Sequence, residues 1–209
     1  MPQALVGGLH DAHFFLQYTG EVHLVGAFFK PAAAIVLLND RTETYKKAFA
    51  PADLVFRRAL TPLIERLRKL SSSTEIAKLL ESFLAPRFLS RDEPRYFVNI
   101  QKAVETIEAS TGSVSLKNLH EMAYMSERNF RGMFTEYVGF SPKEYARIIR
   151  VKKVLRLLKS GTPIFDVAFQ LGYYDPAHLS KDFTEIAGIP PSEILGRLNS
   201  IDLEYLSNQ

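Results

Sequence analysis

Along the first 95 residues, the apolar positions follow a strand-like pattern and then a helical one. Residues 12–18 and 22–29 are rich in aromatic and β-branched side chains, which predicts two strands joined by a hairpin connection at 19–21. The continuous apolar run at 32–38 predicts a short buried helix, although a run of this length would also suit a strand. Because an isolated hairpin is marginal in water, we expect either that another chain completes this sheet or that the sequence begins partway into a domain.

Two amphipathic helices are predicted next. Their apolar residues recur three and four positions apart, as Leu60, Leu63, Ile64, Leu67 and Leu70 in the first and as Ile76, Leu79, Leu80, Phe83 and Leu84 in the second. The polar run 90–93 and the following Pro94 then form the best boundary between two domains.

The remainder of the chain is predicted to be entirely helical. An amphipathic helix begins near Phe97, and Gly112 ends it. Further helices are expected after residues that cap helix N-termini, namely Ser115, Ser126, Ser141, Thr162 and Asp175. At Ser141 the signal is strongest, because Pro142 occupies the first helical position and Glu144 completes a capping box.

The amino-acid composition excludes several kinds of functional site. The 209 residues contain no cysteine, so the chain cannot form a disulfide, a thiolate zinc site, an iron–sulfur cluster or a thiol nucleophile. Its longest apolar run, 32–38, is far shorter than the roughly 20 residues that span a bilayer. The N-terminus also lacks the basic start and apolar core of a signal peptide. These features predict a cytoplasmic protein without a membrane partner or a cofactor.

The distribution of charged residues along the chain is more informative about function than the net charge. Residues 96–209 carry 13 basic and 13 acidic side chains, so this half has no net formal charge. Between Arg128 and Lys159, however, nine side chains are basic and only two are acidic. A concentrated patch of this kind determines the potential that a nearby phosphate experiences. A solvated helix face could have the same composition, so charge alone does not decide between the two interpretations.

An internal repeat lies in the helical half. Residues 134–145 match residues 183–194 at an offset of 49, with Phe, Thr, Glu, Gly, Pro and Glu identical in register. Each copy indicates two short helices around a tight turn, which is the helix-turn-helix unit whose second helix can enter a DNA major groove. Two copies are too few for a solenoid. A helix over residues 142–159 would be about 27 Å long, a spacer that could hold two recognition helices roughly one DNA turn, about 34 Å, apart.

These motifs resemble a known family. SERNFRGMFTEYVGFSPKEYARIIRVKKVLRLL (126–158) and IFDVAFQLGYYDPAHLSKDFTEIAGIPPSEI (164–194) are similar to the double helix-turn-helix domain of the AraC/XylS family of bacterial transcription regulators. The resemblance covers about 96–198, and GYYDPAHL (172–179) is its most specific part. Residues 24–38 and the two helices after them resemble the later portion of a regulatory domain in one branch of that family, which usually has more sheet before this point.

The resemblance implies an α+β chain with two domains. A short mixed β/α domain at 1–94, expected to be incomplete, would sense an effector or dimerise. An all-α domain at 95–209 would hold helix-turn-helix units at about 115–139 and 163–188, joined by a linker helix at about 142–159. Recognition helices at about 126–137 and 176–187 would bind double-stranded DNA. RNA polymerase, a small-molecule effector and a second copy of the chain are the further partners that the family implies.

In the first recognition helix, the buried stripe is expected to comprise Phe130, Phe134 and Tyr137, leaving Arg128, Arg131, Gly132 and Thr135 on the opposite face. Arginine can bind guanine O6 and N7 with two hydrogen bonds, and the resemblance assigns base contacts to Arg128 and Arg131. Both could instead bind phosphate or solvate the helix. Gly132 departs from the family pattern, in which a long polar side chain is common at this position.

In the second recognition helix, the expected buried stripe is Leu179, Phe183 and Ile186. The resemblance places His178 and Lys181 near base edges, and Ala177 could contact a thymine methyl group. Asp182 is expected to make a polar contact within the protein. Helix N-termini and neighbouring cations suggest a set of phosphate contacts, namely Ser126, Thr135, Ser141, Lys143, Arg147 and Arg150. His120 stands where the family usually has a small residue, so it either loosens the first unit or is accommodated.

Other constellations give weaker predictions. His10, His13 and His23 could share a metal only if the expected strands brought them together, and surface or core roles are favoured, so no metal site is predicted. An effector pocket could be lined by aromatic residues of the first part, namely Phe14, Phe15, Tyr18, Phe28 and Phe29, although ordinary core and a dimer surface are favoured for them. No phosphate-binding loop, nucleophile elbow or HExxH motif is present, so no enzyme is predicted.

The sequence therefore predicts a DNA-binding transcription regulator. The alternative is a protein-interaction or anti-regulator module that keeps the scaffold without reading DNA. Gly132, His120 and the absence of net charge in the second half leave that alternative open. A small-molecule-binding domain with enzyme activity ranks far below both.

Overall fold

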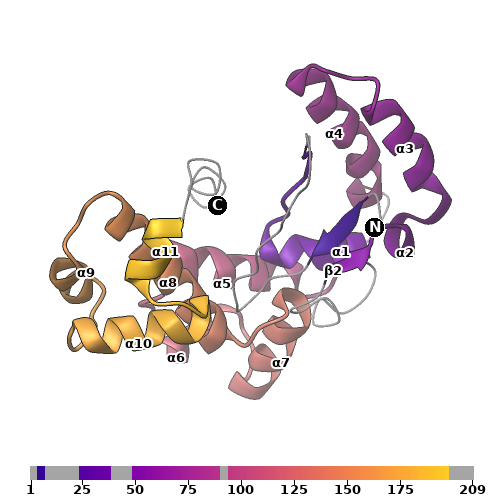
Figure 1. Cartoon of the computed structure of the whole chain (residues 1–209). Coiled ribbons are helices and arrows are strands. Elements are labelled where there is room, and N and C mark those ends of the chain that lie inside the picture. The colour runs from indigo at the N-terminus through magenta and orange to yellow at the C-terminus, as the bar shows by residue number, and fades with distance from the viewer. Residues whose placement is uncertain (1–3, 8–23, 39–48, 90–93, 198–209) are drawn as a thin grey trace.

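The computed structural model describes residues 4–7, 24–38, 49–89 and 94–197. The elements follow in the order β1 (Leu5–Gly7), η1 (Pro31–Ala33), α1 (Ala34–Leu38), β2 (Phe49–Pro51), α2 (Asp53–Phe56), η3 (Arg57–Ala59), α3 (Leu60–Leu67), α4 (Ser73–Leu89), α5 (Phe97–Ala109), α6 (Leu116–Met122), α7 (Glu127–Val138), α8 (Pro142–Lys159), α9 (Ile164–Gln170), α10 (Pro176–Ala187) and α11 (Pro191–Arg197). Figure 1 shows α3 and α4 standing apart from the helices of the second half. The predicted α+β architecture, with two helix-turn-helix units around a long helix, is confirmed.

The two strands among the described residues lie outside the segments for which the sequence pattern predicts strands. β1 and β2 are three residues each and pair antiparallel, with Val6 opposite Ala50. The expected strand at 12–18 lies outside the described residues, and so does the start of the one at 22–29. Residues 24–29 are described and do not form a strand; Leu24 and Phe28 are 70% and 63% exposed. The prediction rested on aromatic and β-branched composition, which makes a strand only where a neighbour supplies a ladder and a packed face.

The helices of the first half agree with the pattern. The run 32–38 is helical, as η1 followed by α1. α3 and α4 form at the two predicted amphipathic segments, and α4 continues through Pro86 to Leu89. Leu60, Leu63 and Leu79 are buried between α3 and α4, together with Ala52. These apolar side chains and the small sheet make a core of their own.

Helix α8 belongs to two further cores. Its first turns place Tyr145, Ala146 and Ile148 in a cluster with α5, α6 and α7. Its later turns place Val151, Val154 and Leu155 in a second cluster with α9 and α10. Each core contains fully buried aromatic rings, so each helix-turn-helix unit is held by apolar packing against a different stretch of the same rod.

The first half of the chain also reaches into the core of the first unit. Ala32 is fully buried and packs in the same cluster as Ile100 and Phe130. Phe29 contacts the ring of Phe88 on α4, with a centroid distance of 5.6 Å. The segment η1–α1 therefore lies against α5 and α7 and connects the first half to the first recognition helix.

Most helix starts match the predicted caps. Ser126 accepts a hydrogen bond from the Asn129 backbone, and Asp175 accepts one from the His178 backbone. Ser141 and Glu144 form the predicted capping box. The prediction at Thr162 is wrong by one residue, because Pro163 occupies the cap position and α9 begins at Ile164. Ser115 precedes α6 as expected, but its side chain makes no capping hydrogen bond.

The two helix-turn-helix units differ in their turns by one residue. The second helices, α7 and α10, begin 49 positions apart, whereas the first helices, α6 and α9, begin 48 positions apart. In the second unit the left-handed residue after the first helix is Gly172, at φ +70°. In the first unit it is Tyr124, at φ +54°. A side chain at positive φ is strained, typically by about 1–2 kcal/mol, so the shorter turn of the first unit contains a local strain that the second avoids.

We predict that Gly112→Ala strongly destabilises the protein. Gly112 ends α5 at φ +76°, and an added Cβ would lie 2.1 Å from the Ala146 carbonyl oxygen on α8. Strain and the displacement of α8 should together cost about 3 kcal/mol or more of unfolding free energy, measured by chemical denaturation. Gly161→Ala is the matched control, because Gly161 has φ +85° with open space around it and should lose only about 1 kcal/mol. Equal losses for the two variants would contradict the clash.

We also predict that Tyr124→Gly raises the stability of the protein. The Tyr124 side chain is 93% exposed, so its removal loses little packing while it relieves the strain at positive φ. A gain of about 0.5–1 kcal/mol is expected by thermal or chemical unfolding, since part of the relief is offset by the greater freedom of glycine in the unfolded chain. Tyr174→Gly is the control, because Tyr174 is 91% exposed but does not adopt a positive φ. That variant should be neutral or destabilising, and a gain of the same size there would refute the explanation.

Candidate nucleic-acid interface

The first recognition helix, α7, separates its apolar and polar faces as predicted. Phe130 and Phe134 are 2% and 0% exposed, and Tyr137 is buried with them. Arg128, Arg131 and Gly132 are exposed on the other side. Thr135 is half-buried, and its hydroxyl donates to the Arg131 carbonyl at 2.8 Å. The arginine side chains expected to read bases are therefore accessible to a ligand.

The second recognition helix, α10, has the same organisation. Leu179 and Phe183 are fully buried, and Ile186 is half-buried. Ala177, His178 and Lys181 are exposed on the opposite face. In Figure 1, α7 and α10 both lie along the lower edge of the second half of the chain.

The His178 ring is oriented by its surroundings. Its Nδ1 atom accepts a hydrogen bond from the Tyr174 backbone at 3.4 Å, and its ring meets the Tyr173 ring edge-on at a centroid distance of 5.4 Å. When Nδ1 is the acceptor of a neutral imidazole, Nε2 carries the proton. His178 therefore presents an N–H donor, which suits acceptor atoms at a major-groove edge such as guanine N7 and O6 or thymine O4.

The N-terminus of α8 is less open to phosphate than the sequence suggested. The Ser141 backbone N–H donates to the Glu144 carboxylate at 2.8 Å, and the Glu144 N–H donates to the Ser141 hydroxyl at 3.3 Å. The capping box thus uses two donors of this helix end and places a carboxylate beside them. The Lys143 side chain, between Ser141 and Glu144 in the sequence, is exposed. It is therefore a better candidate than Ser141 for a phosphate contact at this helix end.

Some basic side chains of α8 make contacts within the protein. The Arg147 guanidinium donates to Asp182 and Glu185 on α10. Arg150 donates to the Gly112 carbonyl at 2.9 Å and lies 5.7 Å from the centre of the Tyr173 ring. Burial lowers the pKa of Lys152, and the charge of Glu108 opposes that shift only in part. Fewer of the nine basic side chains between Arg128 and Lys159 are therefore available to an external phosphate than the sequence alone suggests.

Asp182 and His120 both have partners within the protein. Asp182 makes the predicted intramolecular contact, with Arg147 on one oxygen and with the Tyr173 hydroxyl at 2.8 Å on the other. His120 is accommodated in the first unit, where its Nδ1 atom lies 3.2 Å from the Met125 carbonyl oxygen. Its half-buried ring bridges the turn between α6 and α7.

Sequence reasoning missed the partners of Arg147 and a second long-range contact. The Tyr145 hydroxyl donates to the Glu108 carboxylate at 2.5 Å, which links α8 to α5. Burial and this carboxylate both raise the pKa of Tyr145, so the phenol stays a donor. The only available signal for the Arg147 contact was the acidic pair Asp182 and Glu185, whose spacing of three places both on one side of a helix.

Most of the residues that the sequence offered as candidates for an effector pocket or a metal site lie outside the described part of the chain. This applies to the aromatic residues Phe14, Phe15 and Tyr18, and to the histidines His10, His13 and His23. Of the remaining pocket candidates, Phe28 is exposed and Phe29 packs on Phe88. Within the described residues, no group of histidine and carboxylate side chains is arranged to hold a metal.

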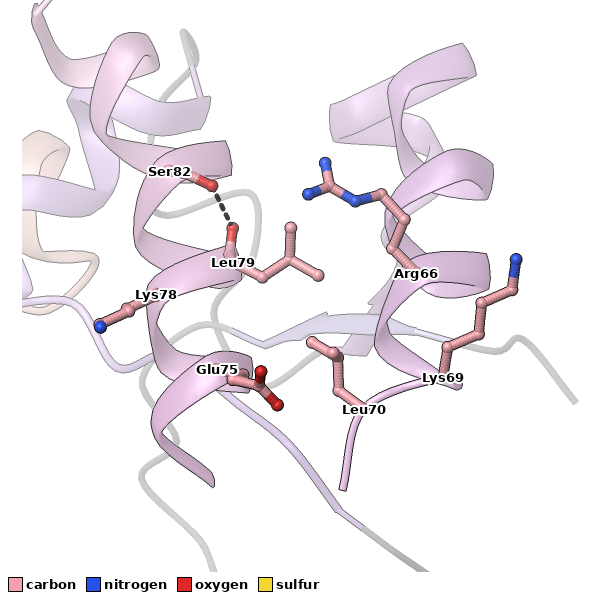
Figure 2. Close-up of a pocket in the computed structure, with 7 residues that line it drawn as sticks. All are labelled: Arg66, Lys69, Leu70, Glu75, Lys78, Leu79 and Ser82. Atoms are coloured by element: carbon pink, nitrogen blue, oxygen red, sulfur yellow. Dashed lines mark hydrogen bonds between the residues drawn. The ribbon is translucent and has the colours of Figure 1, made fainter. Parts of the chain in front are cut away.

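A hollow of about 470 Å³ lies between α3 and α4. Figure 2 shows Leu70 and Leu79 facing each other across it, with the Arg66 side chain pointing into the gap. Lys69 and Lys78 extend away from the gap on either side. The hollow contains none of the aromatic residues that the sequence suggested for an effector pocket.

Among the described helices, none is both long enough and apolar enough to cross a bilayer.

Comparison with known proteins supports the assignment of the second half. Residues 119–197 match a family model described as a helix-turn-helix domain, HTH_18. An uncharacterized HTH-type transcriptional regulator of Escherichia coli (strain K12), YidL, is 35% identical over 98 residues, which is 46% of this chain and 33% of that protein. The lactose operon transcription activator of Staphylococcus xylosus is 32% identical over 97 residues, covering 46% of this chain and 35% of that protein.

Among solved structures, the crystal structure of ToxT from Vibrio cholerae O395 aligns with a TM-score of 0.47 and 16% sequence identity, over 73% of this chain and 60% of that chain. This chain spans about a third of the length of the two curated relatives. Taken with the paired units α6–α7 and α9–α10 around α8, the match to the family model and the two curated relatives confirm the resemblance drawn from the sequence. Residues 119–197 are therefore a helix-turn-helix domain of the AraC type, similar to domains of bacterial transcription regulators.

Proposed function

We propose that this chain is a sequence-specific transcription regulator that inserts α7 and α10 into successive major grooves of one DNA duplex. The observation that carries the proposal is the exposure of Arg128, Arg131, His178 and Lys181 on two helices whose opposite faces are buried by aromatic and aliphatic side chains. Helix α8 has 18 residues and a length of about 27 Å, which suits a spacing of one DNA turn. Lys143 and the cap residue Ser126 are the proposed phosphate contacts, with Thr135 at the edge of α7.

We further propose that the first half of the chain senses an effector or mediates dimerisation. Its segment η1–α1 packs against α7 through the buried Ala32, so a change in the first half has a direct path to the first recognition helix. Of the charged residues that line the hollow between α3 and α4, Arg66 points into it, whereas Lys69 and Lys78 extend away from it. RNA polymerase remains the proposed partner in transcription.

A second candidate function, protein interaction without DNA reading, is favoured by one observation. On α9, Phe165 and Phe169 are 70% and 84% exposed, and they lie four residues apart on one helix face. Exposed aromatic pairs of this kind are typical of protein-binding surfaces. This surface is also compatible with a regulator that binds DNA and a protein partner together.

Selection of bound duplexes from a random DNA pool with the full chain distinguishes these candidates. A regulator should enrich a bipartite motif with half-sites about one helical turn apart. Its affinity for that motif should fall linearly with the logarithm of salt concentration, because phosphate contacts release counterions. Enrichment of no motif, with equal affinity for all duplexes, would reject sequence-specific regulation and leave the interaction module.

We predict that Arg131→Ala weakens binding to the selected motif by about 1–3 kcal/mol, because a bidentate contact to guanine is lost. Affinity for random duplexes should change much less, as measured by titration at fixed salt. Lys69→Ala, in the first half of the chain, is the control and should bind like the parent protein. If Arg131 instead contacts phosphate, affinity would fall equally for all duplexes and the salt slope would drop by about one. An unchanged footprint would argue against any role in binding.

A further inference from the structure

An ion-pair cluster connects the linker helix to the second recognition helix. Arg147 lies on α8 between Ala146 and Ile148, whose side chains are buried in the core of the first unit. Its Nε atom donates to the Asp182 carboxylate, and its Nη2 atom donates to the Glu185 carboxylate. Both carboxylates are on α10. A side chain rooted in the first unit therefore holds the recognition helix of the second.

The Asp182 carboxylate is fully engaged in this cluster. Arg147 binds one of its oxygens, and the Tyr173 hydroxyl donates to the other at 2.8 Å. The Asp182 side chain is only 13% exposed, and Tyr173 is 6% exposed. Burial and the contact with Asp182 both raise the pKa of Tyr173, so its hydroxyl keeps its proton and remains a donor. Each member has a defined partner, which restricts rotation of α10 about its own axis.

Apolar packing also holds the part of α10 that carries Asp182 and Glu185. Ile186, one residue after Glu185, packs against the core of the first unit and also against the core of the second. The last turns of α10 are thus in contact with both units, while the exposed side chains Ala177, His178 and Lys181 occupy its first turns. Movement of the last turns of α10 would therefore also displace Ala177, His178 and Lys181 in its first turns.

The cluster is poorly suited to bind phosphate. Arg147, Asp182 and Glu185 together carry a formal charge of −1, and the neighbouring Arg150, 5.7 Å from the centre of the Tyr173 ring, donates to the Gly112 carbonyl. Two of the nitrogen atoms of Arg147 are already occupied by Asp182 and Glu185. Burial lowers the pKa of Arg147, but the two carboxylates more than offset this and raise it, which keeps the guanidinium charged and paired.

We propose that Arg147 is a positioning residue which, through Asp182, Glu185 and Tyr173, fixes α10 relative to α7 and thereby restricts the protein to one spacing between DNA half-sites. This replaces the expectation from sequence that Arg147 contacts phosphate. The proposal rests on the proposed function, since it concerns how the two recognition helices act together on one duplex.

The test compares Arg147→Met with the parent protein on a set of duplexes. The set contains the selected motif, the same motif with one base pair inserted or removed between half-sites, and the first half-site beside scrambled sequence. We expect the variant to bind the selected motif about 10-fold or more weakly, as the second helix loses base contacts. Its preference for the selected spacing should shrink, its affinity for the single half-site should stay unchanged, and its salt slope should equal that of the parent.

Three further variants isolate positioning from other effects. Arg147→Lys keeps the charge and should restore part of the spacing preference. Arg147→Met combined with Asp182→Asn removes the uncompensated buried carboxylate, so it should fold well yet keep the broadened spacing. Lys143→Met, on the same helix, is the reference for lost phosphate contact and should reduce the salt slope by about one on every duplex. Thermal unfolding of each variant confirms that folded protein is compared.

Two outcomes would overturn the proposal. If Arg147→Met behaves like Lys143→Met, with a uniform loss on all duplexes and a lower salt slope, Arg147 contacts phosphate. If spacing preference is unchanged in both Arg147→Met and the double variant, the cluster does not position α10. Failure of the proposed function is separate, because the parent protein itself would then select no motif.

Discussion

The sharing of helix α8 between two hydrophobic cores is the constraint on which the second half of this protein depends. Its early turns supply buried side chains to the first unit, and its later turns supply them to the second. Because each core is closed by the same rod, neither unit can rotate freely without disrupting packing of fully buried residues. The packing on α8 therefore limits how far α7 and α10 can move relative to each other, and the Arg147 contacts act on the same arrangement.

This sharing explains why several charged residues of α8 do not face a ligand. A helix packed on two sides has little surface left for solvated cations, so Arg147, Arg150 and Lys152 are half-buried. Burial of a charged group is costly unless it is paired. Arg147 meets two carboxylates and Arg150 meets a backbone carbonyl. Arg128 and Arg131, by contrast, lie on the exposed face of α7, whose opposite face is apolar and buried.

The first half of the chain is joined to the second half through η1 and α1, which pack against α5 and α7. Ala32 fills a site in the core of the first unit, beside residues that also support α7. By contrast, α3 and α4 bury their own apolar residues between themselves and the short sheet. Under the proposed function, a regulatory input to the first half would reach α7 by way of η1 and α1, since both contact that helix.

The sequence by itself determined the helices of the second half, most of their caps, the repeat and the exposed faces of α7 and α10, because these depend on spacings of three or four residues and on side chains that bond their own backbone. Tertiary structure decided the rest. The strands are three residues each and pair across more than 40 positions, so no local alternation marks them. Arg147 and Asp182 are 35 residues apart, and only packing brings them together. The one-residue difference between the turns was hidden because the matching segments begin after both turns. Contacts between distant segments, and the burial that forces charges to pair, arise only once the two cores have formed around α8.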